Sequence, residues 1–113
     1  FIIDYIKDLT IVAVEGQSGY ERVLAVGEYY LNPETEMAEI AFSVEKDWQG
    51  KGLSSIVIQK LAEAAKRNGI KGLTAYTSKE NKRMVKLFNT LDYEVKTVSE
   101  GTMIYLEARF CKE

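Results

Sequence analysis

The chain has 113 residues, 46% of them apolar and 28% charged, which is ordinary for one globular domain and excludes a disordered or fibrous chain. Fifteen basic and seventeen acidic residues give a net charge of −2, which offers no basic surface to a nucleic-acid backbone. There is no histidine and a single cysteine, Cys111, so composition excludes a zinc site and Ser-His-Asp or Cys-His nucleophiles. We therefore expect no metal and no nucleic-acid partner.

A lone Cys111 cannot form an internal disulfide, which favours a reducing cytoplasm. The apolar runs are far shorter than the roughly 20 residues of a membrane span, and no signal peptide opens the chain, so we expect no membrane contact. The chain begins at Phe1 without Met, and residues 1–5 already resemble a strand. We expect 1–113 to be a single domain taken from a longer chain that carries further domains.

The first half of the chain predicts three strands. Residues 9–14 and 23–30 are rich in β-branched and aromatic side chains and flank turn residues at 15–19, which predicts a hairpin. A second turn at 32–36 leads to residues 37–44, where apolar side chains alternate with others. This alternation predicts a third strand.

The pattern then changes to a helical period. Apolar residues three and four apart predict a helix from Leu53 that ends at Asn68-Gly69. A short strand at 73–77 follows, and Ser78 is the expected N-cap of a second helix. Two further strands at 93–98 and 102–108 surround a turn at 99–101. This order predicts an α+β fold with a central mixed, mostly antiparallel sheet and flanking helices.

A glycine-rich loop precedes the first helix, with the sequence Gln49-Gly50-Lys51-Gly52-Leu53-Ser54. A helix N-terminus presents unpaired N–H groups and the positive end of the macrodipole, so it favours an anion there. Glycines allow close approach of the backbone and positive φ, and a lysine adds charge. A plain strand-to-helix turn is the alternative interpretation. The spacing fits neither a Walker A loop nor a dinucleotide fingerprint, whose third glycine is replaced by Ser55.

The loop resembles the Gln/Arg-x-x-Gly-x-Gly/Ala signature of the GNAT acetyltransferases, with Ser54 where Gly or Ala is usual. The run Asn81-x-x-Met84-x-x-Leu87-Phe88 is similar to a second family motif, although Phe88 replaces a Tyr and Asp92 a Gly. Residues 38–52 most resemble bacterial protein-lysine acetyltransferases and acetyltransferase domains fused to acyl-CoA synthetases or CoA-transferases. The resemblance implies a GNAT-like acyl-CoA N-acyltransferase fold without the family's N-terminal strand and helices.

The resemblance also implies site residues, with acetyl-CoA as cosubstrate. The pyrophosphate would bind Gln49, Gly50, Lys51, Gly52, Leu53 and Ser54. The backbone N–H of Val44 would face the thioester oxygen. Asn81 would contact the pantetheine arm, unless it caps its own helix.

Proton transfer needs further groups. Glu39 lies on the strand face that the family uses for the acceptor, and it is the candidate general base, acting through water or with a raised pKa. A solvated strand Glu is the alternative. Phe88 cannot donate a proton, and Tyr76 and Tyr93 are substitute acids, although core packing is the default interpretation for both. An acid is dispensable if the thiolate leaves unaided.

We therefore expect an N-acetyltransferase that moves an acetyl group from acetyl-CoA to a primary amine, with a protein lysine favoured over a small amine. One alternative is a non-catalytic acyl-CoA-sensing regulatory domain of a larger acyl-CoA-metabolising protein. Another is a structural or assembly domain. The sensor would bind coenzyme A without catalysing acetyl transfer, and the assembly domain would neither bind coenzyme A nor catalyse transfer.

Overall fold

The computed structural model describes residues 8–16, 19 and 21–110. The expected strand at 1–5 and Cys111 lie outside these residues. The elements in chain order are β1 (Asp8–Glu15), β2 (Arg22–Asn32), β3 (Met37–Val44), the short 3-10 turn η1 (Lys46–Trp48), α1 (Leu53–Arg67), β4 (Gly72–Ser78), α2 (Lys82–Asn89), β5 (Val95–Glu100) and β6 (Met103–Arg109). This is the predicted order of strands and helices.

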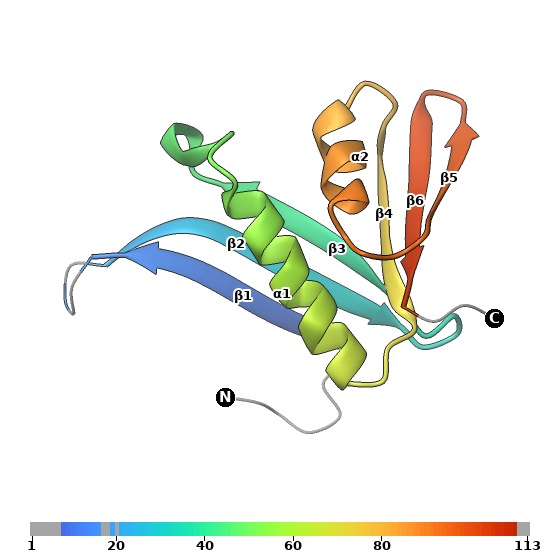
Figure 1. Ribbon diagram of the computed structural model, residues 1–113, viewed down its shortest axis with the longest axis horizontal. Helices are drawn as coiled ribbons and strands as arrows, with labels where there is room; N and C mark the ends of the chain where they lie inside the picture. The colour runs from blue at the N-terminus through green and yellow to red at the C-terminus, as the bar shows by residue number, and fades with distance from the viewer. Residues whose placement is uncertain (1–7, 17–18, 20, 111–113) are drawn as a thin grey trace.

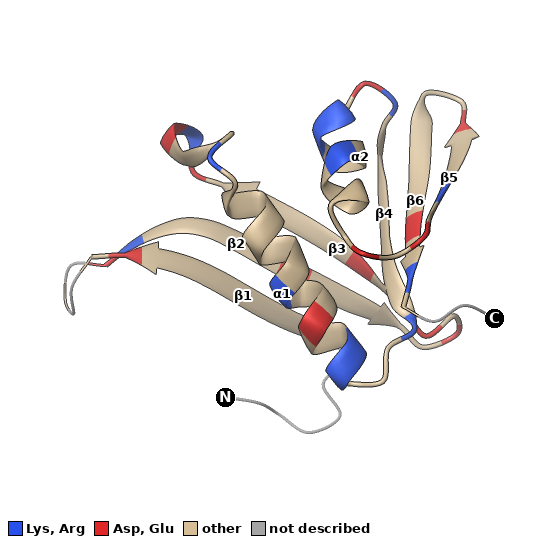
Figure 2. Ribbon diagram, viewed as in Figure 1, with Lys and Arg blue, Asp and Glu red and all other residues tan. Residues whose placement is uncertain are grey.

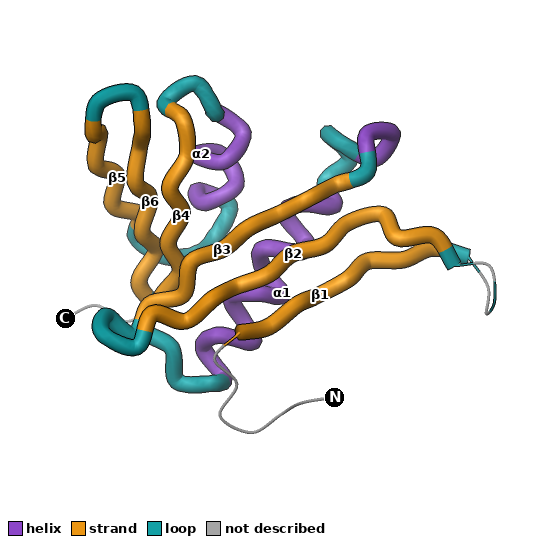
Figure 3. Tube along the Cα trace, turned by 180° about the vertical axis from the view of Figure 1, so that it is seen from behind, coloured by secondary structure: helices purple, strands orange, loops and turns teal. Residues whose placement is uncertain are grey.

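The strands form one six-stranded sheet in the order β1-β2-β3-β4-β6-β5 (Figure 1). Only β3 and β4 are parallel, and α1 is the crossover between them. All other neighbouring strands are antiparallel. Both helices lie on the same face of the sheet, which Figure 3 shows from the opposite side. The predicted α+β class and the mixed, mostly antiparallel sheet are confirmed.

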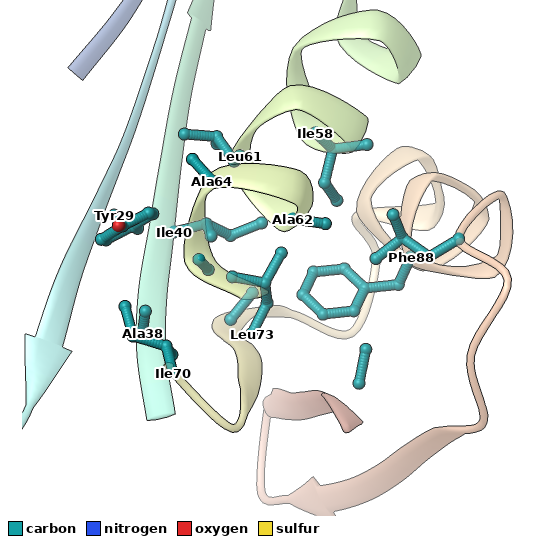
Figure 4. Close-up of a cluster of buried hydrophobic side chains, with 14 of the residues drawn as sticks. Tyr29, Ala38, Ile40, Ile58, Leu61, Ala62, Ala64, Ile70, Leu73 and Phe88 are labelled. Carbon is teal, nitrogen blue, oxygen red and sulfur yellow. The ribbon is translucent and has the colours of Figure 1, made fainter. Parts of the chain in front are cut away.

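The core lies between this sheet face and the two helices (Figure 4). Ile40 and Leu73 from the sheet pack with Leu61 of α1 and Phe88 of α2 in one buried cluster. Phe88 is fully buried, so the residue that replaces the family's Tyr is a core residue. Gly27 of β2 lies directly under α1, since a Cβ there would come within 2.3 Å of Val57 Cγ1. A larger residue would push α1 away from the sheet.

The second helix begins later than predicted. Ser78 is the last residue of β4, and Asn81 is the N-cap of α2, accepting a hydrogen bond from the Met84 N–H at 3.2 Å. Ser78 instead closes a turn, because its hydroxyl accepts from the Glu80 N–H at 3.2 Å. The prediction of Ser78 as the cap was therefore wrong, and that of local capping by Asn81 is confirmed.

The last hairpin also differs in detail. Its turn is Gly101-Thr102, because Ser99 and Glu100 are still paired with β6. Tyr76 was expected in the core, but it lies on the helix-free face of the sheet and is 50% exposed. Its strand neighbours Leu73 and Ala75 are the buried ones. Among the described residues, no helix has both the length and the apolar character needed to cross a membrane.

Candidate functional site

The sheet opens between its two parallel strands. β3 and β4 pair only at Met37–Glu39 with Gly72–Thr74, and beyond these residues the two strands separate (Figure 1). This leaves the second half of β3 bonded to β2 alone. The backbone groups on the other edge of β3 are therefore free to bind something other than β4.

The strand register shows which backbone groups these are. Val44 is opposite Ala25, and the next residue, Glu45, donates its N–H to the Leu24 carbonyl at 2.7 Å. In an antiparallel ladder this makes Val44 and Ala25 a non-hydrogen-bonded pair, so the N–H and C=O of Val44 point away from β2. They face the edge that β4 has left. The Val44 carbonyl accepts a hydrogen bond there from Gln49 Nε2 at 3.2 Å.

A cavity of about 530 Å³ occupies this opening, and we call it the cleft. Its walls come from the end of β3, the glycine loop with the first turn of α1, and α2. It is lined by Phe42, Val44, Gln49, Gly50, Gly52, Ser54, Ser55, Asn81, Arg83, Met84, Lys86, Leu87 and Thr90. The apolar side chains come from β3 and α2, whereas the loop contributes backbone and hydroxyl groups. The loop wall is therefore polar, whereas α2 contributes both apolar side chains and the cations Arg83 and Lys86.

The glycine loop has the geometry of an anion cradle. Gly50 and Gly52 have φ of 79° and 85°, in the left-handed region that favours glycine. A Cβ built on either would meet nothing within 4 Å, so their hydrogens face open space. The first helical bond of α1 runs from the Ile56 N–H to the Gly52 carbonyl, which leaves the amides of Leu53, Ser54 and Ser55 without helical partners. These amides fit a pyrophosphate.

The segment just before the glycine loop is held in place by interactions of charged side chains. Glu45 caps η1 by accepting from the Asp47 N–H at 3.4 Å, and it forms an ion pair with Arg22 of β2. The hydrogen bond from Arg22 lowers the pKa of Glu45 and raises that of Arg22. Lys51 Nζ lies 5.5 Å from the centroid of the Trp48 ring. Lys51 thus contacts Trp48 and does not line the cleft.

The cleft contains most of the predicted binding residues. Val44, Gln49, Gly50, Gly52, Ser54 and Asn81 all line it. Leu53 does not, because its side chain packs against the core and only its N–H remains available to a ligand. Asn81 also holds its own position, since Nδ2 donates to Thr77 Oγ1 at 2.9 Å while Oδ1 caps α2.

Glu39 lies elsewhere. It is exposed on the helix-free face of the sheet, paired with Tyr30 on one side and Thr74 on the other. Five residues of extended strand separate its Cα from that of Val44 by about 16 Å. A single side chain cannot span this distance, so any proton transfer from an amine held near Val44 would need intervening water.

The two substitute acids also lie away from the cleft. Tyr76 donates its hydroxyl hydrogen bond to Glu100, and this bond raises the pKa of Tyr76. Tyr93 packs against Phe110 with ring centroids 5.1 Å apart. Neither lines the cleft. Tyr105, which lies beside Tyr76 on the helix-free face, has its pKa raised to about 12 by burial and by its hydrogen bond to Glu107.

Sequence reasoning missed the α2 wall of the cleft. Met84 and Leu87 were quoted as part of a family motif but were assigned no contact with a ligand, and Arg83 and Lys86 were not singled out. Arg83 extends to the glycine loop, where Nη1 donates to Gln49 Oε1 at 3.2 Å. Figure 2 shows the basic segments of α2 in blue. Spacings of three and four from Arg83 to Lys86 and Leu87 could have indicated one shared helix face.

Acidic groups are absent from the cleft lining described above. Within residues 8–16, 19 and 21–110, no group of three or more His, Cys, Asp or Glu side chains could hold a metal ion.

A sequence profile described as "Acetyltransferase (GNAT) family" matches residues 3–93. The chain is 29% identical over 82 residues to "Acetyltransferase PA5475" of Pseudomonas aeruginosa, covering 73% of this chain and 44% of that protein. The chain thus spans less than half the length of this curated relative.

Two solved structures are similar. The GNAT domain of S. lividans PAT superposes with a TM-score of 0.76 at 24% identity, covering 96% of this chain and 64% of that one. The cAMP-binding acyltransferase from Mycobacterium smegmatis also has a TM-score of 0.76, at 27% identity over 96% of this chain and 33% of that one. The first likeness shows the fold alone.

The family profile spans the loop, the splayed strands and the whole of α2, the three parts that enclose the cleft. The chain therefore belongs to the GNAT acetyltransferase family, whose cosubstrate is acetyl-CoA.

Proposed function

We propose that this chain transfers an acetyl group from acetyl-CoA to a primary amine, with a protein lysine as the favoured acceptor. The observation that carries this proposal is the cleft at the splayed edge of β3, with free amides at one end and an apolar wall along its side. Coenzyme A has the matching chemistry, because an anionic head is joined to a long arm of amides and methylenes. The resemblance of residues 38–52 to bacterial protein-lysine acetyltransferases supports the lysine acceptor.

The binding mode follows from the cleft. The pyrophosphate accepts hydrogen bonds from the loop amides at Gly50–Ser54, and the pantetheine arm lies against Met84 and Leu87 of α2. Asn81 lies beside this arm. The thioester then reaches the end of β3, where the Val44 N–H donates to its oxygen.

The chemistry is an addition and an elimination. The neutral amine attacks the thioester carbon, the carbonyl oxygen becomes negative, and the Val44 N–H stabilises that charge. The carbon–sulfur bond then breaks, the nitrogen loses its second proton to water, and the sulfur leaves as a thiolate, which solvent protonates. Glu39 accepts the proton that the ammonium group loses, through water. No protein acid is needed, in keeping with the buried Phe88.

The decisive test compares Glu39→Gln with Glu63→Gln, a matched change at an exposed position of α1. We expect the wild type to release coenzyme A from acetyl-CoA with at least one acceptor in a panel of lysine peptides, polyamines and amino acids. Glu39→Gln should lower kcat by about 100-fold or more, as loss of a general base does, and leave the Kd for acetyl-CoA unchanged. Glu63→Gln should match the wild type. Full turnover in Glu39→Gln would remove Glu39 from the mechanism.

The distance of Glu39 from the cleft favours a second candidate, an acyl-CoA-sensing regulatory domain. Such a domain would bind acetyl-CoA but release no coenzyme A with any acceptor of the panel. A protein that neither binds nor turns over acetyl-CoA would contradict both candidates.

A further inference from the structure

Arg83 is placed unusually for a helix residue. It lies in the first turn of α2, together with Lys82, and that turn contains no acidic residue. Positive side chains are unfavourable there, because the N-terminus is the positive end of the helix dipole. Asn81 already caps the helix. Helix stability therefore does not explain a guanidinium at this position.

The contacts of Arg83 do not explain it either. Among the described residues, no carboxylate lies within salt-bridge distance of Arg83. Its hydrogen-bond partner is a neutral amide oxygen, Gln49 Oε1, at 3.2 Å, and the side chain is solvent-exposed. Gln49 in turn donates to the Val44 carbonyl at 3.2 Å. Together these two bonds form a bridge across the cleft from β3 to α2.

The bridge ends beside the anion cradle. Gln49 directly precedes Gly50, the first glycine of the loop, so its hydrogen bond holds the guanidinium beside the start of the loop. Lys86 lines the same wall one turn further along α2. The cleft lining contains these cations and no acidic group, so a phosphate entering it meets loop amides on one side and a guanidinium fork on the other.

We propose that Arg83 is a pyrophosphate-binding residue that clamps the coenzyme from the side opposite the glycine loop. This rests on the proposed function, because it assigns the ligand of the same cleft. Without ligand, Arg83 is bonded to Gln49. With acetyl-CoA present, it leaves this neutral partner and forms a charged hydrogen bond with a pyrophosphate oxygen, closing the cleft over the phosphates.

The test measures Kd for acetyl-CoA and for acetyl-3′-dephospho-CoA, which keeps the pyrophosphate but lacks the ribose phosphate. Binding is followed by fluorescence of the only tryptophan, Trp48, with calorimetry as a check. The variants are Arg83→Met, Arg83→Lys and the control Lys82→Met, which removes one positive charge from the same helical turn outside the cleft lining. Each titration is repeated at low and high salt.

We expect Arg83→Met to weaken both ligands by the same factor, about tenfold, and to flatten the salt dependence of binding. Arg83→Lys should recover part of the affinity, and Lys82→Met should stay within about twofold of the wild type. A merely structural role of Arg83 would lower affinity without changing the salt dependence. That outcome would overturn the proposal. A loss of affinity for acetyl-CoA alone would also overturn it, because it would assign Arg83 to the ribose phosphate.

The same data separate this proposal from the proposed function. A wild type that fails to bind acetyl-CoA contradicts both. A wild type that binds, together with an Arg83→Met variant of equal affinity, contradicts the clamp alone.

Discussion

At the scale of single residues, Gly52 combines two properties that only a glycine provides together. Its φ of 85° starts α1 from the left-handed region, and the space beyond its Cα is open. An alanine there would strain the backbone and would also place a methyl group in the open space beside the loop, where we propose that a phosphate binds. The cost for the fold and the cost for ligand binding can therefore be separated by experiment.

We predict that Gly52→Ala lowers the free energy of unfolding by about 1–2 kcal/mol and weakens acetyl-CoA binding at least tenfold. Gly69→Ala is the matched control, because Gly69 has a φ of 79° and no atom within 4 Å of an added Cβ, but lies at the other end of α1. It should cost the same stability and leave the Kd unchanged. Urea unfolding and acetyl-CoA titration measure the two effects. Equal Kd values for the two variants would contradict the anion cradle.

Residue type alone predicted the conformation of this loop, because the positive φ of its glycines and the start of α1 are set by local sequence. It did not predict Arg83, since an arginine at a helix start has no local purpose and the contact with Gln49 spans 34 positions of sequence. The same limit explains Ser78. Ser78 and Asn81 are equally good caps by type, and the choice depends on where pairing of β4 with β6 ends, which is at Ser78 opposite Met103.

At the scale of elements, α2 is a short helix that forms one wall of the cleft, so its first turn affects both the stability of the helix and the lining of the cleft. Asn81 caps this turn and also lines the cleft. Whether it contacts the pantetheine arm as well is a question that two substitutions can answer.

We predict that Asn81→Ala lowers the free energy of unfolding by about 1 kcal/mol, because the cap to the Met84 N–H is lost. Asn81→Asp should restore stability, since a carboxylate caps equally well, but should still weaken acetyl-CoA binding. Ser78→Ala should cost less stability than Asn81→Ala. Thermal unfolding and titration measure both properties. Wild-type affinity in Asn81→Asp would limit Asn81 to capping.

The elements themselves were largely predictable, whereas their spatial order was not. The strand at 37–44 was predicted to the residue, because alternation of apolar side chains is a strong local signal. The order β3-β4-β6-β5, and therefore the opening between β3 and β4, depends on pairings between distant segments. For this reason the sequence indicated the loop but not the apolar wall facing it.

At the scale of the whole molecule, the helix-free face of the sheet carries tyrosine–glutamate hydrogen bonds. Tyr105 donates to Glu107 at 2.8 Å, and Arg109 donates to the same carboxylate at 2.7 Å. Burial alone would raise the pKa of Glu107, but these two hydrogen bonds outweigh it and lower that pKa below 4.5. Glu107 is the one charged residue among the buried side chains of the described chain.

This shift predicts a pH dependence of stability. Because the pKa of Glu107 is lower in the folded than in the unfolded chain, its contribution is present above pH 4.5 and is lost as the pH falls through the lowered value. We predict that the Tm of Glu107→Gln changes less than that of the wild type between pH 7 and about pH 3. Glu63→Gln, on the exposed side of α1, should follow the wild type. Parallel curves for Glu107→Gln and the wild type would contradict this assignment.

The three residue pairs that join β3 to β4 also have a mechanical consequence for the cleft. Any rotation between the two half-sheets would turn about these pairs, and the free end of β3 at Val44 lies about 16 Å beyond Glu39, the last of them. A rotation of only about 5° between the two half-sheets would move that end by about 1.4 Å, a displacement of the size that can cost a hundredfold in rate. Ala38 and Leu73, which are buried at these pairs, would therefore influence the geometry of the proposed acyl transfer without lining the cleft.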